Sequence, residues 1–207
     1  MFPTMLNRFI LTIFAVLMWS TGILVNAGAA SEEPRVIVER LNATLLQVMM
    51  NAQRLGFQGR ADMLAPVLEK TFAFPEMARI AAGQHWNTLD PDQKAKLVER
   101  FTQMSIATFA NRFDGYSGER FEIIGEEPAP RDRYLVRSDI VKPSGESVPL
   151  NYVFTRIDGD WRIVDVYLKG TISELATRRS EFVSVLGRQG FDELMRRIEK
   201  NIAALRG

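Results

Sequence analysis

The sequence predicts an α+β protein in which N-terminal helices pack with a four-stranded antiparallel sheet and C-terminal helices. Up to residue 118, apolar residues recur every three or four positions, which is the spacing of one helix face. From residue 121 to residue 168 they recur at every second position, as in half-buried strands, with short turn sequences between the segments. Helical spacing then returns until the C-terminus. Because consecutive strands joined by short turns pair side by side, helices covering one antiparallel sheet are the expected architecture.

Residues 1–29 show the order of features that is typical of a secretory signal peptide. One basic residue, Arg8, precedes an apolar run over residues 9–25, and the small residues Ala27-Gly28-Ala29 follow it. The alternative is an uncleaved membrane anchor, because the run is nearly long enough to span a bilayer. We expect cleavage after the small residues, export to the periplasm, and a single domain over residues 30–207.

The composition excludes several classes of protein. Removing residues 1–29 takes away one basic residue and leaves 25 Lys and Arg against 25 Asp and Glu. A chain without net charge lacks the positive surface that nucleic-acid binding requires. The sequence contains no cysteine, so it can form neither a disulfide framework nor a lipidated cysteine. Stability must therefore come from the apolar core.

Four helices are expected before the sheet. Their signals are a capping Ser or Asp, a proline in the first turn and a glycine after the last turn. The clearest signal is Asp90-Pro91-Asp92-Gln93, which combines a cap, a first-turn proline and a capping-box glutamine. The expected helices cover residues 34–55, 62–71, 75–82 and 91–113.

The four expected strands cover residues 121–125, 134–141, 147–157 and 161–168, and two helices over 171–187 and 191–205 close the chain. Asp158-Gly159 is the sequence of a two-residue type I′ hairpin turn. This turn predicts three opposed pairs on one face of the sheet, namely Phe154 with Ile163, Tyr152 with Asp165, and Leu150 with Tyr167. A three-residue loop ending at Gly145 would add Tyr134 and Val136 to the same face. That face would then be apolar and aromatic, with Asp165 as its only charge.

The sequence contains little that could catalyse a reaction. It has one histidine, His85, and no glycine-rich phosphate loop, so we expect no nucleophile triad, metal site or cofactor. Asp165 could act as a general base with a raised pKa if it faced a cavity. The alternative, which we favour, is that the Tyr152 hydroxyl satisfies it structurally. Arg178 or Arg179 could bind an anionic head group, or could pair with acids on the same helix.

Large apolar residues are more numerous than one seam between helices and sheet usually needs. They are concentrated in about 45 residues, together with the aromatic face of the sheet. An apolar cavity would explain this excess, whereas an ordinary filled core remains the alternative. The residues concerned in the helical half are Phe72, Phe74, Met77, Ile80, Trp86, Phe101, Met104, Phe109, Phe113 and Tyr116.

Three segments resemble one known family. They are FDGYSGERFEIIGEEP at 113–128, LNYVFTR at 150–156, and WRIVDVYLKGTISELATRRSEF at 161–182. They resemble the MlaC-like family of periplasmic phospholipid-binding proteins, also called the toluene-tolerance family of ABC-transporter auxiliary proteins. The chain is most similar to its hopanoid-associated HpnM branch, over essentially all of residues 30–207.

The resemblance implies a cone-like α+β fold with an apolar pocket for lipid chains. It further implies a carrier, not an enzyme, that moves phospholipid or a hopanoid between inner and outer membranes. Its expected partners are an inner-membrane lipid transporter and an outer-membrane acceptor, and we expect a monomer. The excess of large apolar residues and the positions that match motifs of the family together predict the residues that bind the lipid. These residues are Phe72, Phe74, Met77, Phe101, Met104, Phe109, Tyr116, Val136, Tyr152, Phe154, Ile163, Val164 and Val166.

Two other functions stay open on the sequence alone. One is an isomerase-like enzyme that uses Asp165 inside the cavity. The other is an adaptor that docks on an inner-membrane transporter without carrying lipid.

Overall fold

The computed structural model describes residues 32–206, which all fall within one compact unit of the chain. The expected signal peptide therefore lies outside the described residues. The helices are α1 (Pro34–Met50), α2 (Ala52–Thr71), α3 (Phe74–Ala82), the 3-10 helix η1 (Gly83–Thr88), α4 (Pro91–Arg112), α5 (Glu174–Gln189) and α6 (Phe191–Arg206). The strands are β1 (Arg120–Ala129), β2 (Arg133–Val141), β3 (Ser147–Ile157), β4 (Asp160–Leu168) and β5 (Ile172–Ser173). Within this part of the chain, no helix is both long and apolar enough to cross a membrane.

The predicted α+β class is confirmed, with one more strand than expected. The sheet is antiparallel in the order β1-β2-β3-β4-β5. Strand β5 consists of Ile172 and Ser173, which pair with Leu168 and Tyr167. Two residues are too few to show an alternating pattern, so the sequence could not reveal this strand.

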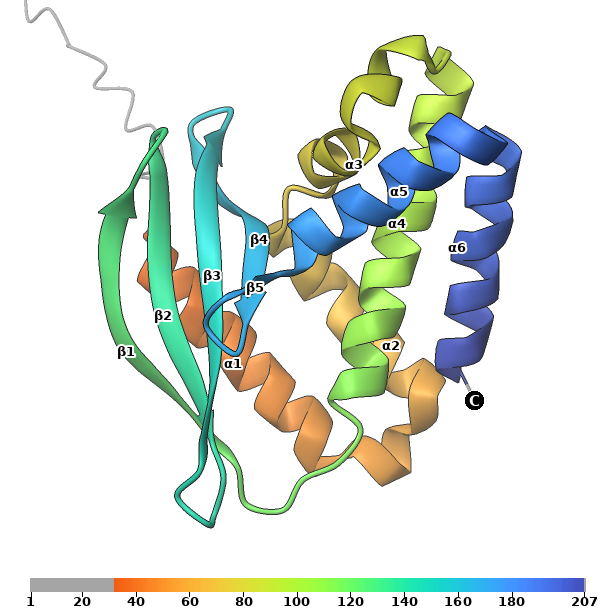
Figure 1. Ribbon diagram of the computed structural model, residues 1–207. Coiled ribbons are helices and arrows are strands. Elements are labelled where there is room, and N and C mark those ends of the chain that lie inside the picture. Colours follow the sequence, from red (N-terminus) through yellow and green to blue (C-terminus); the bar gives the residue numbers. More distant parts are fainter. Residues whose placement is uncertain (1–31, 207) are drawn as a thin grey trace, which may run out of the picture. The chain divides into compact units, whose positions relative to one another are not determined.

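The helices gather on one side of the sheet, as Figure 1 shows. Helix α1 packs against β1 and β2, while α5 starts at β5 and packs against α3 and α6. Helix α4 lies among α2, α3 and α6 and forms the centre of the helical layer. The capping box predicted for α4 is present, because Gln93 N–H donates to Asp90 Oδ1 at 2.8 Å and Asp90 N–H donates to Gln93 Oε1 at 3.1 Å.

The first two helices divide at a different place from the prediction. The first expected helix continued to residue 55, but α1 ends at Met50, and Gly56 (φ +60°) interrupts α2. Buried Arg60 donates to the carbonyl oxygens of Ala52 (3.1 Å) and Ala110 (2.7 Å). This side chain satisfies a carbonyl near the break and ties α2 to α4, a long-range contact that apolar periodicity does not encode.

The register of the sheet agrees with the prediction only on one side of a β-bulge. Phe154 lies opposite Ile163, as expected, and Tyr134 and Val136 lie opposite Phe154 and Tyr152. Between Val153 and Phe154 the register shifts, because β4 contains one extra residue at this point.

The predicted pairs beyond the bulge are therefore wrong. Tyr152 lies opposite Val166, and Leu150 lies opposite Leu168. Asp165 lies opposite Val153, so it does not share the face of Tyr152. A shift of one residue exchanges the two faces of a strand, and the alternation of the sequence cannot show where such a shift occurs.

Asp165 holds the start of α5 instead of contacting Tyr152. Its Oδ1 accepts from the N–H groups of Val166 (2.8 Å) and Leu175 (3.0 Å), and its Oδ2 accepts from the Ser173 hydroxyl (2.5 Å). The Tyr152 hydroxyl donates to Asn42 on α1 at 3.4 Å. The structural role that we favoured for Asp165 is thus present, but with other partners than the predicted one.

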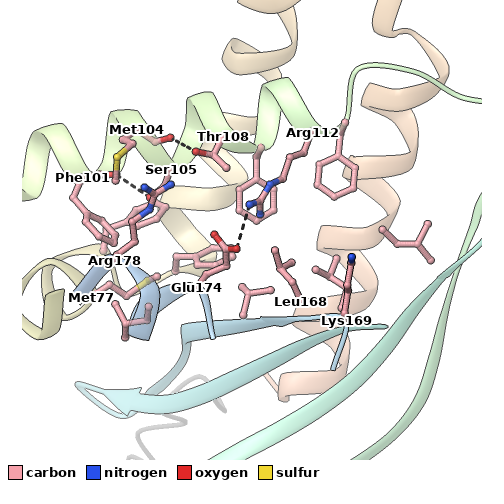
Figure 2. Close-up of a pocket in the computed structure, with 18 of the residues that line it drawn as sticks. Met77, Phe101, Met104, Ser105, Thr108, Arg112, Leu168, Lys169, Glu174 and Arg178 are labelled. Atoms are coloured by element: carbon pink, nitrogen blue, oxygen red, sulfur yellow. Dashed lines mark hydrogen bonds and ion pairs between the residues drawn. The ribbon is translucent and has the colours of Figure 1, made fainter. Parts of the chain in front are cut away.

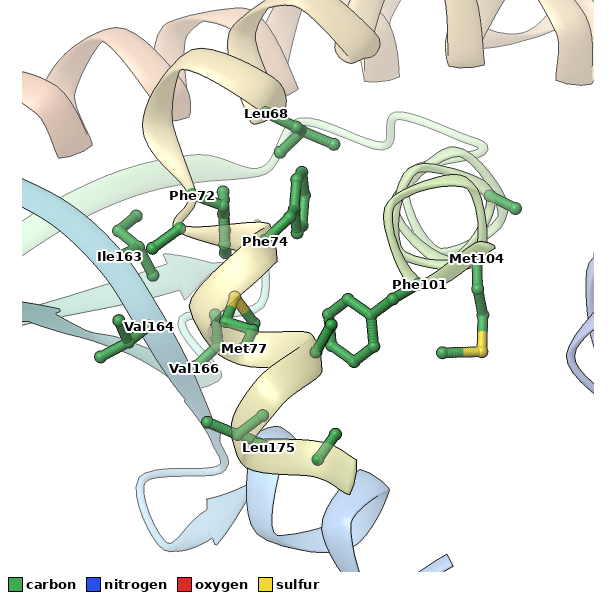
Figure 3. Close-up of a cluster of buried hydrophobic side chains, with 14 of the residues drawn as sticks. Leu68, Phe72, Phe74, Met77, Phe101, Met104, Ile163, Val164, Val166 and Leu175 are labelled. Atoms are coloured by element: carbon green, nitrogen blue, oxygen red, sulfur yellow. The ribbon is translucent and has the colours of Figure 1, made fainter. Parts of the chain in front are cut away.

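The core joins the two layers where α2 passes into α3. Ala73 N–H donates to the carbonyl of Ile163 at 2.8 Å, and Phe72 forms an isolated bridge with the same residue of β4. Figure 3 shows the buried cluster around this junction, with side chains from α2, α3, α4, β4 and α5.

We predict that Asp165→Asn folds and loses on the order of 1 kcal/mol at neutral pH, since an amide oxygen can still accept from the two backbone N–H groups. Burial raises the pKa of the Asp165 carboxyl, although its three hydrogen bonds and the charge of Arg133 act in the opposite direction. The folded state therefore binds this proton more readily than the unfolded state. The contribution of the protonated Asp165 carboxyl to the stability of the fold is complete when the pH lies below the pKa of this group in the unfolded chain. It is lost as the pH rises through its pKa in the folded protein.

Urea unfolding of both proteins between pH 4 and pH 8 measures this effect. The stability of the native protein relative to the Asn variant should increase as the pH falls. Asp165→Ala is the control, because it leaves the Leu175 N–H without its acceptor and should lose more stability at every pH. A difference between native protein and Asn variant that is independent of pH would contradict the prediction.

Candidate functional site

A cavity of about 250 Å³ lies between the helical layer and one end of the sheet (Figure 2). Its walls come from the α2–α3 junction, α4, the ends of β2, β3 and β4, and the start of α5. The residues that line it are Phe72, Phe74, Met77, Phe101, Met104, Ser105, Thr108, Phe109, Arg112, Phe113, Ile140, Val148, Pro149, Leu150, Val166, Leu168, Lys169, Glu174, Leu175 and Arg178.

Aromatic rings form the wall on the side of α2 and α3. Phe72 and Phe74 are stacked, with ring centroids 5.5 Å apart. Phe109 meets the edge of Phe72 at 5.6 Å, and Phe101 meets Phe74 at 6.4 Å. The bridge between Phe72 and β4 holds this wall against the sheet.

Helix α4 contributes one continuous stripe to the cavity. Residues 101, 104, 105, 108, 109 and 112 line it, and their spacing of three or four places them on one face of the helix. The opposite wall is the helix-facing side of the sheet, where Leu150, Val166 and Leu168 are neighbours across β3 and β4. Because of the β-bulge, Val166 and Leu168 lie on the same face of the sheet as Leu150 and Ile163.

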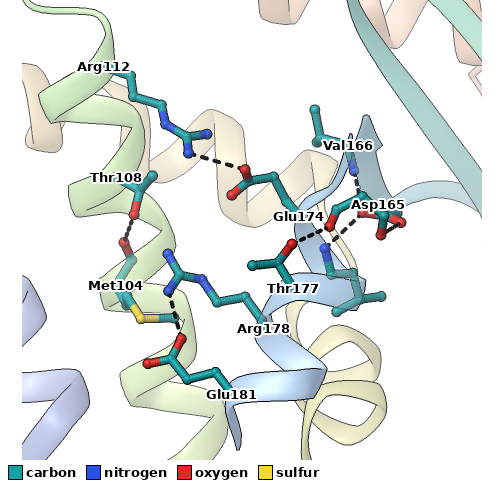
Figure 4. Close-up of polar contacts among 11 residues, drawn as sticks. Met104, Thr108, Arg112, Asp165, Val166, Glu174, Thr177, Arg178 and Glu181 are labelled. Atoms are coloured by element: carbon teal, nitrogen blue, oxygen red, sulfur yellow. Dashed lines mark hydrogen bonds and ion pairs between the residues drawn. The ribbon is translucent and has the colours of Figure 1, made fainter. Parts of the chain in front are cut away.

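Four charged residues also contribute to the lining, and we call them its charged rim. Arg112 at the end of α4 forms an ion pair of 3.2 Å with Glu174 at the start of α5, as Figure 4 shows. Lys169, in the turn after β4, is exposed, whereas Arg178 is only 22% exposed and pairs with Glu181 at 3.3 Å. The lining of the cavity is therefore mostly apolar, and its charges are confined to these four residues.

Two hydroxyl groups in the lining are already engaged. Ser105 donates to the Phe101 carbonyl and Thr108 donates to the Met104 carbonyl, each at 2.8 Å. Both bonds lie within α4, so these hydroxyls have no proton left for a ligand.

The structure brings together seven of the thirteen predicted site residues. Those that line the cavity are Phe72, Phe74, Met77, Phe101, Met104, Phe109 and Val166. Five others lie in the packed core away from the cavity: Val136, Tyr152, Phe154, Ile163 and Val164. Tyr116 is 45% exposed and also does not line it.

The predicted sheet wall is displaced along the strands. Tyr152, Phe154 and Ile163 are on the helix-facing side, but α1 and the α2–α3 junction cover them. The cavity opens farther along, at Leu150 and Leu168. The position of the cavity along β3 depends on where the helices cross the sheet.

Most of the charged rim is not predicted from the sequence. Arg178 was considered as a ligand for an anionic head group, but Arg112, Lys169 and Glu174 were not. In the sequence, Arg112 ends a long helix, and Lys169 follows a strand and precedes Gly170. The ends of helices and strands are the places where side chains can reach a cavity between the two layers.

A second hollow, of about 410 Å³, also borders Phe72 and Phe74. Glu69, Glu99, Thr102 and Gln103 contribute polar side chains to it. Pockets for small ligands are mostly apolar, with few polar groups. The cavity under the charged rim fits this description better.

The acid and the metal site that a catalytic function would use were sought among the residues that the structure describes. Asp165, the acid considered as a general base, does not line the cavity and is directed toward the start of α5. Within residues 32–206, no group of three or more His, Cys, Asp or Glu residues could hold a metal ion. The geometry corresponds to a binding site.

Comparison with known proteins shows the fold and the family of this chain. The phospholipid-binding protein from Ralstonia solanacearum, solved in complex with a phospholipid, has a similar fold, with a TM-score of 0.74 and 20% sequence identity. The similarity covers 85% of this chain and 100% of that one. No protein with a curated description matches this chain in sequence. The profile of the MlaC protein family matches residues 39–200, so the chain belongs to the MlaC family.

Proposed function

We propose that this protein is a periplasmic lipid carrier that shields acyl chains, or the apolar rings of a hopanoid, inside the cavity under the charged rim. The observation that carries the proposal is the contrast between an apolar interior and an opening lined by Arg112, Lys169, Glu174 and Arg178. An amphipathic lipid has the same division into an apolar body and a polar head. The phospholipid bound to the similar R. solanacearum protein supports the same ligand class.

The proposed carrier moves lipid between the inner and outer membranes as a monomer. It would exchange its cargo with an inner-membrane lipid transporter and with an outer-membrane acceptor. The cavity volume of about 250 Å³ is close to the lower limit of roughly 300–1,000 Å³ for ligand pockets. We therefore expect the helical layer to move away from the sheet when a whole lipid enters.

Lipid extraction from the purified protein provides the most direct test. The protein, isolated from periplasmic extract without detergent, should contain close to one equivalent of phospholipid or hopanoid by mass spectrometry. The proposal is overturned if the correctly folded protein contains no lipid, both as isolated and after incubation with vesicles of cell lipids. That result would favour a non-carrying adaptor.

A second experiment places the lipid in this cavity. Met104 lines it, so Met104→Trp should fill the space and reduce the lipid content several-fold, while the lipid-free fold stays close to native stability. Leu97 is the matched control, because it is fully buried on the same helix but does not line the cavity. Leu97→Trp should overpack the core and lose roughly 1–3 kcal/mol. Thermal unfolding of lipid-free protein separates the two effects, and strong destabilisation by Met104→Trp would show that this position is filled core.

Export to the periplasm depends on residues 1–29. If they form a cleaved signal peptide, the mature protein begins at Ala30, because cleavage follows the small residues Ala27-Gly28-Ala29. N-terminal sequencing of the protein from periplasmic extract measures this directly. Recovery of the intact chain in the membrane fraction alone would instead indicate a retained anchor.

A further inference from the structure

We propose that Arg60 is a positioning residue of the cavity, which acts from α2 by holding the last turn of α4 and thereby the rings of Phe109 and Phe113 in the cavity wall. Arg60 is not one of the lining residues, so it acts on a ligand only through α4. The proposed role rests on the carrier function to the extent that it requires a ligand in the cavity. It does not depend on which lipid that ligand is.

Arg60 is a buried cation whose hydrogen-bond partners carry no charge. The residue is 9% exposed, and its guanidinium donates to two backbone carbonyls, from Nε to Ala110 at 2.7 Å and from a terminal nitrogen to Ala52 at 3.1 Å. Among residues 32–206, no carboxylate forms an ion pair with Arg60. A buried charge is strongly destabilising unless its hydrogen bonds are made. The Ala110 carbonyl must therefore stay where Arg60 can reach it.

Ala110 lies at the end of α4, where a cation is most favourable. The last four carbonyls of a helix have no N–H partner within the helix, and they form the negative end of its dipole. Because α4 ends at Arg112, the Ala110 carbonyl belongs to this group, and Arg60 supplies both the missing donor and the complementary charge. The second bond, to Ala52, reaches the segment before the break of α2 at Gly56. One guanidinium thus joins both parts of α2 to the end of α4.

Three successive residues attach the last turn of α4 to three different helices. Ala110 accepts from Arg60 on α2. Asn111 donates to a carbonyl of α6 at 3.1 Å, and Arg112 pairs with Glu174 of α5 at 3.2 Å. The contacts of Asn111 and Arg112 are exposed, and exposed polar pairs contribute little to stability in water. The buried bond to Arg60 is therefore the strongest of the three attachments.

The last turn of α4 carries part of the cavity wall. Phe109, Arg112 and Phe113 line the cavity, and the rings of Phe109 and Phe113 are stacked with their centroids 5.8 Å apart. Phe109 also meets the edge of Phe72. Figure 1 shows this end of α4 beside α2 and at the connection to β1. If the turn moved, both rings would leave the wall, so the bond from Arg60 keeps a ligand enclosed.

The test combines two measurements on the native protein and three variants. Hydrogen exchange of lipid-free protein, followed by mass spectrometry, reports how well the amides of residues 109–113 are protected. Stopped-flow fluorescence reports the release of cis-parinaric acid, a fluorescent fatty acid, from the loaded protein. In Arg60→Gln we expect residues 109–113 to exchange about tenfold faster, which is the effect of one hydrogen bond from a charged group. Release of the fatty acid should accelerate by a similar factor.

Two further variants separate positioning from general stability. Arg60→Lys keeps the charge at the helix end but lacks the fork that reaches both carbonyls, so its exchange and release should be intermediate. Leu97→Ala is the matched control, because Leu97 is buried on the same helix and does not line the cavity. It should lower the free energy of unfolding by leaving a core cavity. Since a helix end exchanges by local opening, residues 109–113 and the release rate should stay native in this control.

Unchanged exchange and release in Arg60→Gln would overturn the proposed role, and so would equal changes in Leu97→Ala. Should Arg60→Gln not fold, Arg60→Lys decides the question, because native exchange and release in that variant would show that the bonds of the guanidinium do not hold the turn. Failure of the native protein to bind cis-parinaric acid or cell lipids would overturn the carrier function. Hydrogen exchange would then decide alone whether Arg60 holds the end of α4.

Discussion

Strand β4 contains one residue more than β3 between the pairs Phe154–Ile163 and Val153–Asp165, and the geometry of the cavity depends on this bulge. Without it, Asp165 would lie opposite Tyr152 on the helix-facing side of the sheet. With it, Val166 and Leu168 occupy that side and complete an apolar wall. The bulge therefore removes a carboxylate from the wall of an apolar cavity, where a charge without partners would be strongly destabilising.

The same bulge connects the sheet to the charged rim. It directs Asp165 toward the start of α5, where the carboxylate accepts from the Leu175 N–H and the Ser173 hydroxyl. Ser173 in turn caps α5 by accepting from the Ala176 N–H at 2.9 Å. Because Glu174 and Arg178 belong to the first turns of this helix, the Asp165 contacts set their position over the cavity. A buried acid thus acts on the site as a positioning residue, without contacting the cavity.

Apolar interior and charged rim have different physical origins. The interior exists because rings from the α2–α3 junction, α3 and α4 meet a sheet face at a distance that their side chains do not fill. The rim exists because helix and strand ends meet at the opening, where solvent can hydrate charges. Together they match the division of an amphipathic ligand into an apolar body and a polar head.

The sequence alone determined the fold class and the starting point of α4, because these follow from periodicity and from local capping signals. It also supplied the aromatic residues of the cavity, since Phe72, Phe74, Phe101 and Phe109 exceed the needs of one seam. Only the tertiary structure decided the register of β4, because an extra residue in a strand leaves no mark on local pattern. It likewise decided which part of the apolar sheet face remains uncovered, and that Arg112, Lys169, Glu174 and Arg178 share one rim. The rim residues alone are up to 66 positions apart in the chain, from Arg112 to Arg178, and they come together only when the helices cross the sheet.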